Sequence, residues 1–342
     1  MICRTSFAGM AGAASVLLAG LACAAQVAEP ASVSDESEGW ALVWADEFDG
    51  TTLDRTKWAP EESCWGGGNA ERQCYTDRPE NIRVEDGILR LIARPERYRG
   101  PLYPPELSHL GRGTKRQRYT SGKVRTKGLA DWRYGRFSAR IKLPAGQGTW
   151  PAFWMMPTDA AYGQWPLSGE IDTMEAANLG TPCADCAGGT ERRTSGALHF
   201  GDVPPANEYL FARAAPASAQ APATGWRTYT VEWAEDTIQW FVDGKIFLRL
   251  TADQWRTASK DAAGRPHAPF DQPFYLMLNY AVGGNLAEKS NGGGFDPSAF
   301  PSEMQVDWVR VEQCADDNTG KACLTDTAWQ GEPMGPWEVQ AR

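Results

Sequence analysis

An all-β fold, a sandwich or jelly roll of two packed sheets, is the architecture that this sequence predicts. Apolar and polar residues alternate over many short segments, which is the period of a half-buried strand. Turn signals separate these segments, as they do in β-sandwiches and jelly rolls. Helical periodicity is absent over long stretches, and residues 249–260 are the one candidate for a short helix.

The expected strands follow one another from Trp40 onward. Residues 82–84 and 89–91 flank Asp86-Gly87, and Asp243-Gly244 follows another alternating segment, so both pairs predict β-hairpins. Further strands are expected at residues 137–143, 229–233, 238–242, 274–282 and 304–311.

The bulk composition limits the domain count and the partners. At 342 residues the chain is long enough for one large β domain or two smaller ones. It contains 15 Trp, enough for a packed core and for platforms that stack on sugar rings. The net charge of −9 argues against nucleic acid or an anionic membrane surface as a partner, and weakly against strongly sulfated polysaccharides.

The N-terminus has the pattern of an export signal. Arg4 precedes an apolar stretch from Met10 to Leu21, and Ala22-Cys23-Ala24 resembles a cleavage site. Residues 1–24 are therefore expected to be a signal peptide, followed by a flexible leader at 25–38. This predicts a secreted or periplasmic protein, with a lipoprotein attached through the cysteine of the cleavage site as the less favoured alternative.

Six cysteines follow the expected signal, and an even number in an exported chain suggests disulfides. Short separations favour the pairs Cys64–Cys74, Cys183–Cys186 and Cys314–Cys323. A zinc site at Cys183 and Cys186 is disfavoured, because no second Cys or His pair lies nearby.

The chemistry is concentrated in the run Glu170-Ile171-Asp172-Thr173-Met174-Glu175. In a regular strand Glu170 and Asp172 share a face and Glu175 points away. One extra residue, a bulge at Thr173 or Met174, would return Glu175 to the shared face. Two carboxyl groups about 5–6 Å apart are the arrangement of retaining glycosidases.

Five segments carry a wider pattern, in order along residues 40–313: Trp44–Gly50, Gly68–Thr76, Gly146–Met155, Ser168–Glu175 and Val306–Val311. Together they resemble glycoside hydrolase family 16, most closely its bacterial endo-β-1,3-glucanases (laminarinases). The resemblance implies a concanavalin-like β-jelly roll of two curved antiparallel sheets, with the substrate cleft on the concave one. It places the catalytic domain at 39–313 and leaves 314–342 as a C-terminal tail.

The resemblance also implies roles for single residues. Glu170 matches the nucleophile, Glu175 the general acid and base, and Asp172 the carboxyl that sets their proton balance. Positions that match substrate-binding residues of the cleft are Asn69, Glu71, Trp150, Trp154, Trp165 and His199. No cofactor is expected for catalysis, but Glu47, Gly87 and Asp307 match the positions of a structural calcium, whose ligands are oxygen atoms.

Two departures from the family pattern affect specificity. Leu286 stands where many laminarinases have a Trp, so a stacking platform is missing there or is supplied from elsewhere. The insertion at 177–194 directly follows the catalytic strand and could narrow the leaving-group side of the cleft.

The leading hypothesis is a monomeric, retaining endo-β-1,3-glucanase whose partner is a neutral polysaccharide. Alternatives within the enzyme class are hydrolysis of mixed-linkage β-glucan or galactan, and transglycosylation. A lectin on the same jelly roll is the alternative from another class, but a lectin does not require two close glutamates in different proton states.

Overall fold

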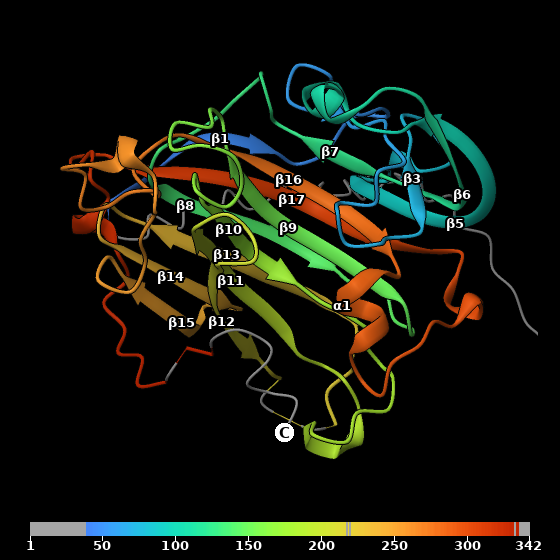
Figure 1. Cartoon of the computed structure of the whole chain (residues 1–342). Helices are drawn as coiled ribbons and strands as arrows, with labels where there is room; N and C mark the ends of the chain where they lie inside the picture. The colour runs from blue at the N-terminus through green and yellow to red at the C-terminus, as the bar shows by residue number, and fades with distance from the viewer. Residues whose placement is uncertain (1–38, 217, 219, 332, 335–342) are drawn as a thin grey trace, which may run out of the picture. The chain divides into compact units, whose positions relative to one another are not determined.

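The computed structural model describes residues 39–216, 218, 220–331 and 333–334, which form two antiparallel-dominated β-sheets (Figure 1). The larger sheet comprises β1 (Trp40–Asp46), β3 (Gln73–Tyr75), β4 (Ile82–Glu85), β5 (Ile88–Pro101), β6 (Thr114–Ser121), β8 (Gly135–Lys142), β13 (Trp226–Trp233), β14 (Thr237–Val242), β15 (Lys245–Thr251) and β17 (Ser302–Cys314). The smaller sheet comprises β2 (Ala59–Pro60), β7 (Lys123–Arg125), β9 (Thr149–Pro157), β10 (Glu170–Glu175), β11 (Thr194–Gly201), β12 (Asn207–Ala214) and β16 (Phe274–Val282).

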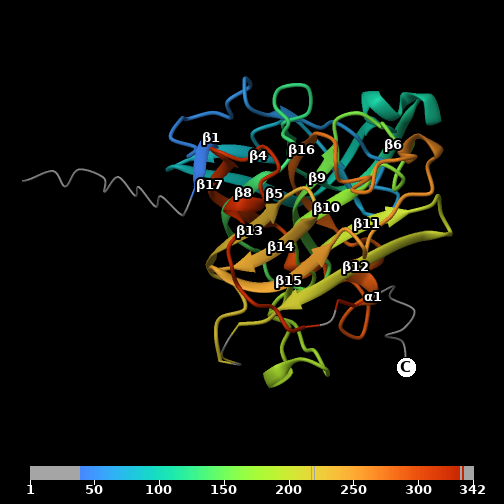
Figure 2. The ribbon, with the colours of Figure 1, turned by 90° about the vertical axis from the view of Figure 1, so that its left-hand side faces the viewer.

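Strands distant in the sequence are neighbours in both sheets, as a jelly roll requires. The larger sheet has the order β15-β14-β13-β8-β17-β5-β6-β3, with β1 also on β17 and β4 on β5. The smaller sheet has the order β12-β11-β10-β9-β16-β7-β2. Figure 2 views the layers from the side, with β8, β13 and β14 in one and β9, β10 and β11 in the other. The predicted all-β sandwich is confirmed.

Both predicted hairpins are present. Glu85 pairs with Ile88 across Asp86-Gly87, and Val242 pairs with Lys245 across Asp243-Gly244. All four turn residues have positive φ. Two successive positive φ angles define the type I′ turn, whose twist matches that of the flanking strands.

The expected helix at 249–260 is wrong. Residues up to Thr251 belong to β15, and the segment after it forms turns, with only a 3₁₀ turn at Lys260–Ala262. Gln254 accepts from the amide of Thr251, and Ser259 accepts from that of Asp261, so polar side chains hold the turns. In the described part of the chain the one α-helix is α1 (Gly284–Lys289), and no helix there is long and apolar enough to cross a membrane.

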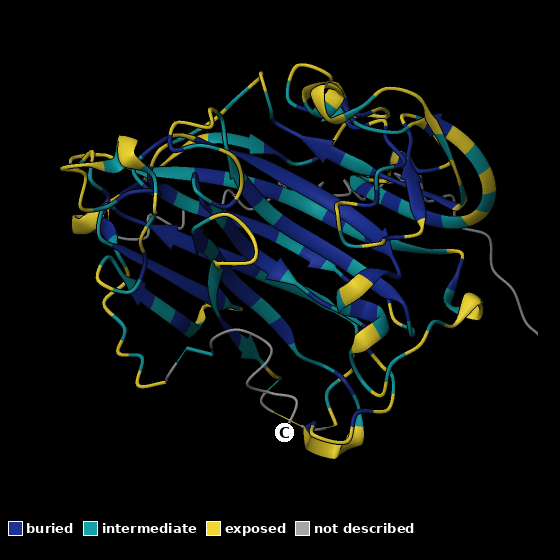
Figure 3. Cartoon of the chain, in the orientation of Figure 1, coloured by how far each residue is buried: buried dark blue, intermediate teal, exposed yellow. Residues whose placement is uncertain are grey.

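The core lies between the two sheets. β16 is buried along its whole length (Figure 3). Phe137, Ala139 and Ile141 of β8 are inaccessible to water. Trp240 of β14 crosses this core and donates from Nε1 to the carbonyl of Asp172, at 2.8 Å. This hydrogen bond therefore sets the distance between the larger sheet and the strand that carries the acidic run.

Part of the expected tail packs onto the β domain. Thr325 donates its amide and its hydroxyl to the carboxylate of Glu232, and Met334 exchanges backbone hydrogen bonds with Phe211 of β12. The domain boundary at 313 and the signal at 1–24 stay predictions, since the latter lies outside the described residues.

Candidate active site

The acidic run forms β10, and it contains the predicted bulge. Asp172 and Glu175 are three residues apart, but their partners on β11, Ala197 and Ser195, are two apart. On β9, Trp154 and Phe153 are adjacent while their partners Asp172 and Met174 are not, so Thr173 is the extra residue. The bulge lies where the sequence placed it.

The bulge sorts the side chains of β10 between two environments. Ile171 and Met174 have no exposed surface and belong to the core. Glu170, Asp172 and Glu175 therefore lie on the outer face of the smaller sheet. In a strand of the same six residues without a bulge, strict alternation would turn one glutamate into the core, where an unpaired charge is costly.

Each glutamate is held by the indole of a tryptophan. Trp165 donates from Nε1 to Oε2 of Glu170 at 2.5 Å, and Trp150 donates to Oε1 of Glu175 at 2.8 Å. Trp165 is 38% exposed, so its ring is open to a ligand. These two predicted binding residues thus also orient the carboxylates.

Asp172 lies between the two glutamates on β10, and His199 lies beside it on β11. Asp172 is buried, and Nε2 of His199 lies 3.2 Å from its Oδ2. Polar atoms of Glu170, Asp172 and His199 all lie within 4.8 Å of one another. The His199 ring stacks on Tyr209 of β12, with centroids 5.2 Å apart.

Burial and mutual repulsion alter the proton affinity of the acidic trio. Burial, and then the neighbouring Asp172, raise the pKa of Glu170 to about 8. Burial, and then Glu175, raise the pKa of Asp172 well above its ordinary value, and burial also raises the pKa of Glu175. The site therefore retains protons at pH values where exposed carboxyls are ionised.

Trp154 lies on the same face of β9 as Trp150, four residues further along the strand. Its indole donates to Asn279 of β16 at 2.6 Å, and Asn279 donates to the hydroxyl of Tyr75. Lys123 lies over the Trp154 ring, 5.0 Å from its centroid. A polar network therefore continues the site toward β7.

The loop with Asn69 and Glu71 reaches this face at α1. A Cβ on Gly284 would lie 3.0–3.2 Å from Glu71, Asn69 and Trp150, so all three surround that glycine. Glu71 is buried, and its carboxylate accepts from Gln73 at 2.6 Å. Glu71 thereby connects the loop to Gln73 at the start of β3.

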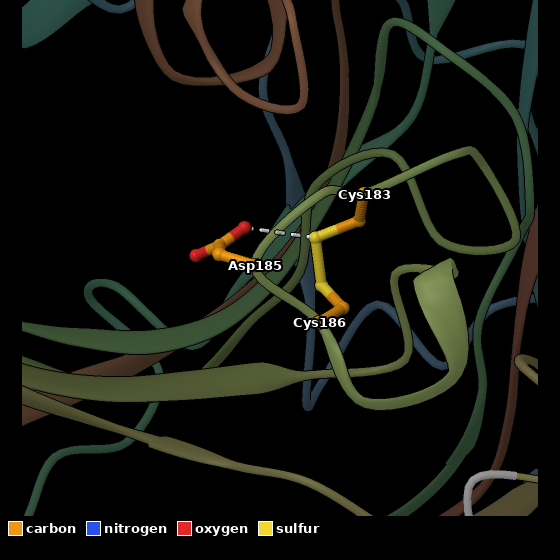
Figure 4. A group of neighbouring side chains, drawn as sticks. All are labelled: Cys183, Asp185 and Cys186. Atoms are coloured by element: carbon orange, nitrogen blue, oxygen red, sulfur yellow. Dashed lines mark hydrogen bonds between the residues drawn. A yellow bond between two sulfur atoms is a disulfide. The ribbon is translucent and has the colours of Figure 1, made fainter.

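The three predicted disulfides are present. Cys64–Cys74 ties down the loop just described, and Cys314–Cys323 closes the start of the tail. Cys183 and Cys186 are bonded to each other in the 177–194 insertion, beside Asp185 (Figure 4). Thiolates, which zinc requires, are therefore not free at this motif.

The comparisons with known proteins agree with this geometry. Residues 76–310 match the family described as glycosyl hydrolases family 16. The chain belongs to glycoside hydrolase family 16. A Niallia circulans protein named glucan endo-1,3-beta-glucosidase A1 is 41% identical over 283 residues, which are 80% of this chain but 38% of that protein.

Two comparisons concern Rhodothermus marinus. A protein of that organism named beta-glucanase is 39% identical over 284 residues, covering 81% of this chain and 87% of its own length. The X-ray structure of the laminarinase from R. marinus superposes with a TM-score of 0.61 at 35% identity, covering 80% of this chain and 97% of that one. The expected jelly roll of family 16 is thereby confirmed.

Several residues of this family 16 site were missed by sequence reasoning. They are Tyr75, Lys123, Tyr209 and Asn279. The sequence offers a signal for Asn279, because it is the one amide among the aliphatic and aromatic side chains of 274–282. The others lie on strands whose neighbours in space are far away in sequence.

Proposed function

We propose that this chain is a retaining endo-glycosidase that hydrolyses internal β-1,3-glucosidic bonds of laminarin-like glucans. The observation that carries the proposal is the bulged β10, which presents Glu170 and Glu175 on one face with Asp172 between them. The names of the two relatives described above support β-glucan as the substrate class.

The mechanism has two displacements. Glu170 attacks the anomeric carbon while Glu175 gives its proton to the departing glycosidic oxygen, which leaves a glycosyl ester on Glu170. Glu175, now a carboxylate, takes a proton from water as that water attacks the same carbon and releases Glu170. The configuration is inverted twice and so retained.

The surrounding groups maintain different proton states in the two glutamates. Burial raises the pKa of both glutamates; Asp172 raises that of Glu170 further, whereas His199 lowers both. The trio titrates as a unit, and one shared proton must lie on Glu175 for the first step. The indole of Trp165 stabilises the ionised form of Glu170.

Sugar rings would stack on the exposed part of Trp165 and on Trp150 and Trp154, which lie on the same face of the sheet. Asn69 and Glu71 would bind hydroxyls on the glycone side, and His199 those on the leaving-group side. Glu71 would have to exchange its bond with Gln73 for one with the sugar.

Product analysis on laminarin, lichenan, agarose and κ-carrageenan, side by side, tests the substrate. Fastest release of oligosaccharides from laminarin is expected. Release from a galactan alone would preserve the catalytic roles and refute the β-1,3-glucan proposal. Binding without turnover on all four would favour the lectin.

Azide distinguishes the roles of the two glutamates. In Glu170→Gly, azide should replace the nucleophile and give the α-glycosyl azide. In Glu175→Ala, azide should attack the glycosyl enzyme and give the β-glycosyl azide. The opposite pattern of anomers would reverse the assignment.

A structural calcium at Glu47, Gly87 and Asp307 is a second part of the proposal. Asp46 pairs with Val309 and Leu89 with Val306, so the three positions lie close to paired residues of β17, and oxygen donors suit calcium. However, Arg310 donates to Glu47 at 2.8 and 3.0 Å, and Arg140 pairs with Asp307. Calcium binding would require both arginines to move away from these carboxylates. If they do, added calcium should raise Tm and EDTA should lower it. If they do not, neither addition should change Tm.

Export to an oxidising compartment, secreted or periplasmic, completes the proposal, and three disulfides support it. We expect the mature protein to start near residue 25 and to be monomeric, which N-terminal sequencing and light scattering would test.

A further inference from the structure

The ribbon formed by β5 and β6 has a charge opposite to that of the whole chain. Residues 94–118 hold seven cationic side chains and two carboxylates, a formal charge of +5 in a chain of −9. The cations are Arg94, Arg97, Arg99, Arg112, Lys115, Arg116 and Arg118. The proposed hydrolysis uses none of them.

Four of these arginines share one exposed face. Arg97 and Arg99 alternate with half-buried residues on β5, and Arg116 and Arg118 do so on β6. Figure 3 shows this alternation of exposed and intermediate residues along the ribbon. Arg99 is directly opposite Arg116 in the strand register. We call these four residues the arginine face; on such strands Cβ atoms of one face lie about 7 Å apart along a strand and about 5 Å apart across a pair.

The carboxylates of the ribbon do not neutralise this face. Glu96 pairs with Arg78 at 2.7 Å, and Glu106 pairs with Arg125, both outside the ribbon. Within the described residues, no carboxylate lies within 4.0 Å of the arginine face. Like charges directly opposite each other destabilise a strand pair, so an anionic ligand would relieve an existing repulsion.

We propose that the arginine face binds an acidic polysaccharide through its sulfate or carboxylate groups. The planar guanidinium fork matches such groups bidentately, and a regular array of forks suits a polymer with regularly repeated charges. Single-stranded nucleic acid sites add aromatic rings for base stacking, but Tyr98 lies on the other face of the ribbon. Membrane binding needs several apolar side chains, and Leu110, between the two strands, is the one exposed large apolar residue among residues 94–118.

The position of the ribbon supports a polysaccharide rather than another polyanion, and to that extent the inference rests on the proposed function. On its other face Lys115 and Gln117 line a groove of about 520 Å³ together with Glu71 and Arg72. This groove adjoins Gly284, which Trp150 also contacts. Binding of an acidic glycan to the ribbon would therefore keep the proposed catalytic face close to other polysaccharides mixed with that glycan.

Surface plasmon resonance on immobilised dextran sulfate tests the proposal. The variant Arg99→Gln/Arg116→Gln should weaken binding at least 10-fold, while Lys245→Gln/Lys260→Gln, which removes the same charge elsewhere, should change it less than 2-fold. Affinity should fall steeply between about 0.05 and about 0.5 M salt, because exposed charges are screened. Unmodified dextran should not bind, and laminarin hydrolysis by both variants should equal that of the wild type.

Three results would overturn the proposal. One is equal binding by the arginine and lysine variants at unchanged Tm. Another is binding of an oligothymidylate as tight as that of dextran sulfate, and the third is equally tight binding of phosphatidylglycerol vesicles. Glu170→Gln separates this inference from the proposed function, since it should abolish hydrolysis and leave the dextran sulfate affinity unchanged.

Discussion

Glu170 illustrates how the burial of a single carboxyl beside another can reduce stability as the pH rises. Its pKa of about 8 in the folded chain compares with an ordinary value of 4.5. Between these pH values the folded chain keeps a proton that the unfolded chain loses. The free energy of unfolding therefore falls as the pH rises through this window.

Glu170→Gln should consequently stabilise the fold at alkaline pH. The amide has no proton to lose, so Tm should exceed that of the wild type by a few degrees at pH near 8.5 and by little near pH 4.5. Calorimetry at both pH values checks this. Glu62→Gln, at an exposed position, is the control and should show no such trend. A pH-independent difference for Glu170→Gln would contradict the explanation.

Asp172 should set the acidic limb of the activity profile. After burial, its charge is the largest cause that raises the pKa of Glu170. In the proposed mechanism the attack requires ionised Glu170, so Asp172→Asn should lower that pKa and move the acidic limb of kcat/KM to lower pH. A loss of kcat with an unmoved limb would mean that Asp172 acts by positioning alone.

At the scale of the element, the bulge in β10 has one task, which is to absorb an extra residue. Removal of Thr173 leaves Glu-Ile-Asp-Met-Glu, in which strict alternation also places all three carboxyls on one face. A regular strand can therefore present the same groups as the bulged one, with a small change in their separation.

Deletion of Thr173 should thus retain hydrolysis, with a loss of at most about 10²-fold, the cost of a misplacement of about 1 Å. Reducing-sugar assays on laminarin measure the effect. Glu175→Gln in the deletion background is the control and should remove the remaining turnover. A folded deletion variant with no activity would show that the bulge itself sets the required separation.

At the scale of the whole molecule, a hydrogen bond joins the two sheets where Trp240 of β14 meets β10. A Cβ on Gly196 would lie 2.5 Å from the Trp240 ring, so only glycine allows the indole to reach the carbonyl of Asp172. Gly196→Ala should cost about 1–3 kcal/mol by overpacking and lower Tm by several degrees.

The indole also sets the distance of β10 from the larger sheet, and β10 carries the acidic side chains. Gly196→Ala should therefore lower kcat as well as Tm. Gly225→Ala is the matched control, since a Cβ there would have nothing within 4 Å. Differential scanning calorimetry and laminarin turnover measure both effects. An unchanged kcat with a lowered Tm would separate packing from positioning.

The sequence predicted those features that depend on local physics. Alternation predicted the strands, Asp-Gly the hairpins, and short spacing the three disulfides. The odd offset between Asp172 and Glu175 predicted a bulge, because side chains alternate with a period of two. The helix at 249–260 failed because polar side chains stabilised turns there instead.

The tertiary structure decided what depends on neighbours distant in the chain. The contacts of Trp154 with Asn279 and of His199 with Tyr209 follow from strand order, which local periodicity does not encode. Likewise, a net charge of −9 conceals the arginine face, because composition averages over the surface whereas strand pairing gathers charges on one side of it.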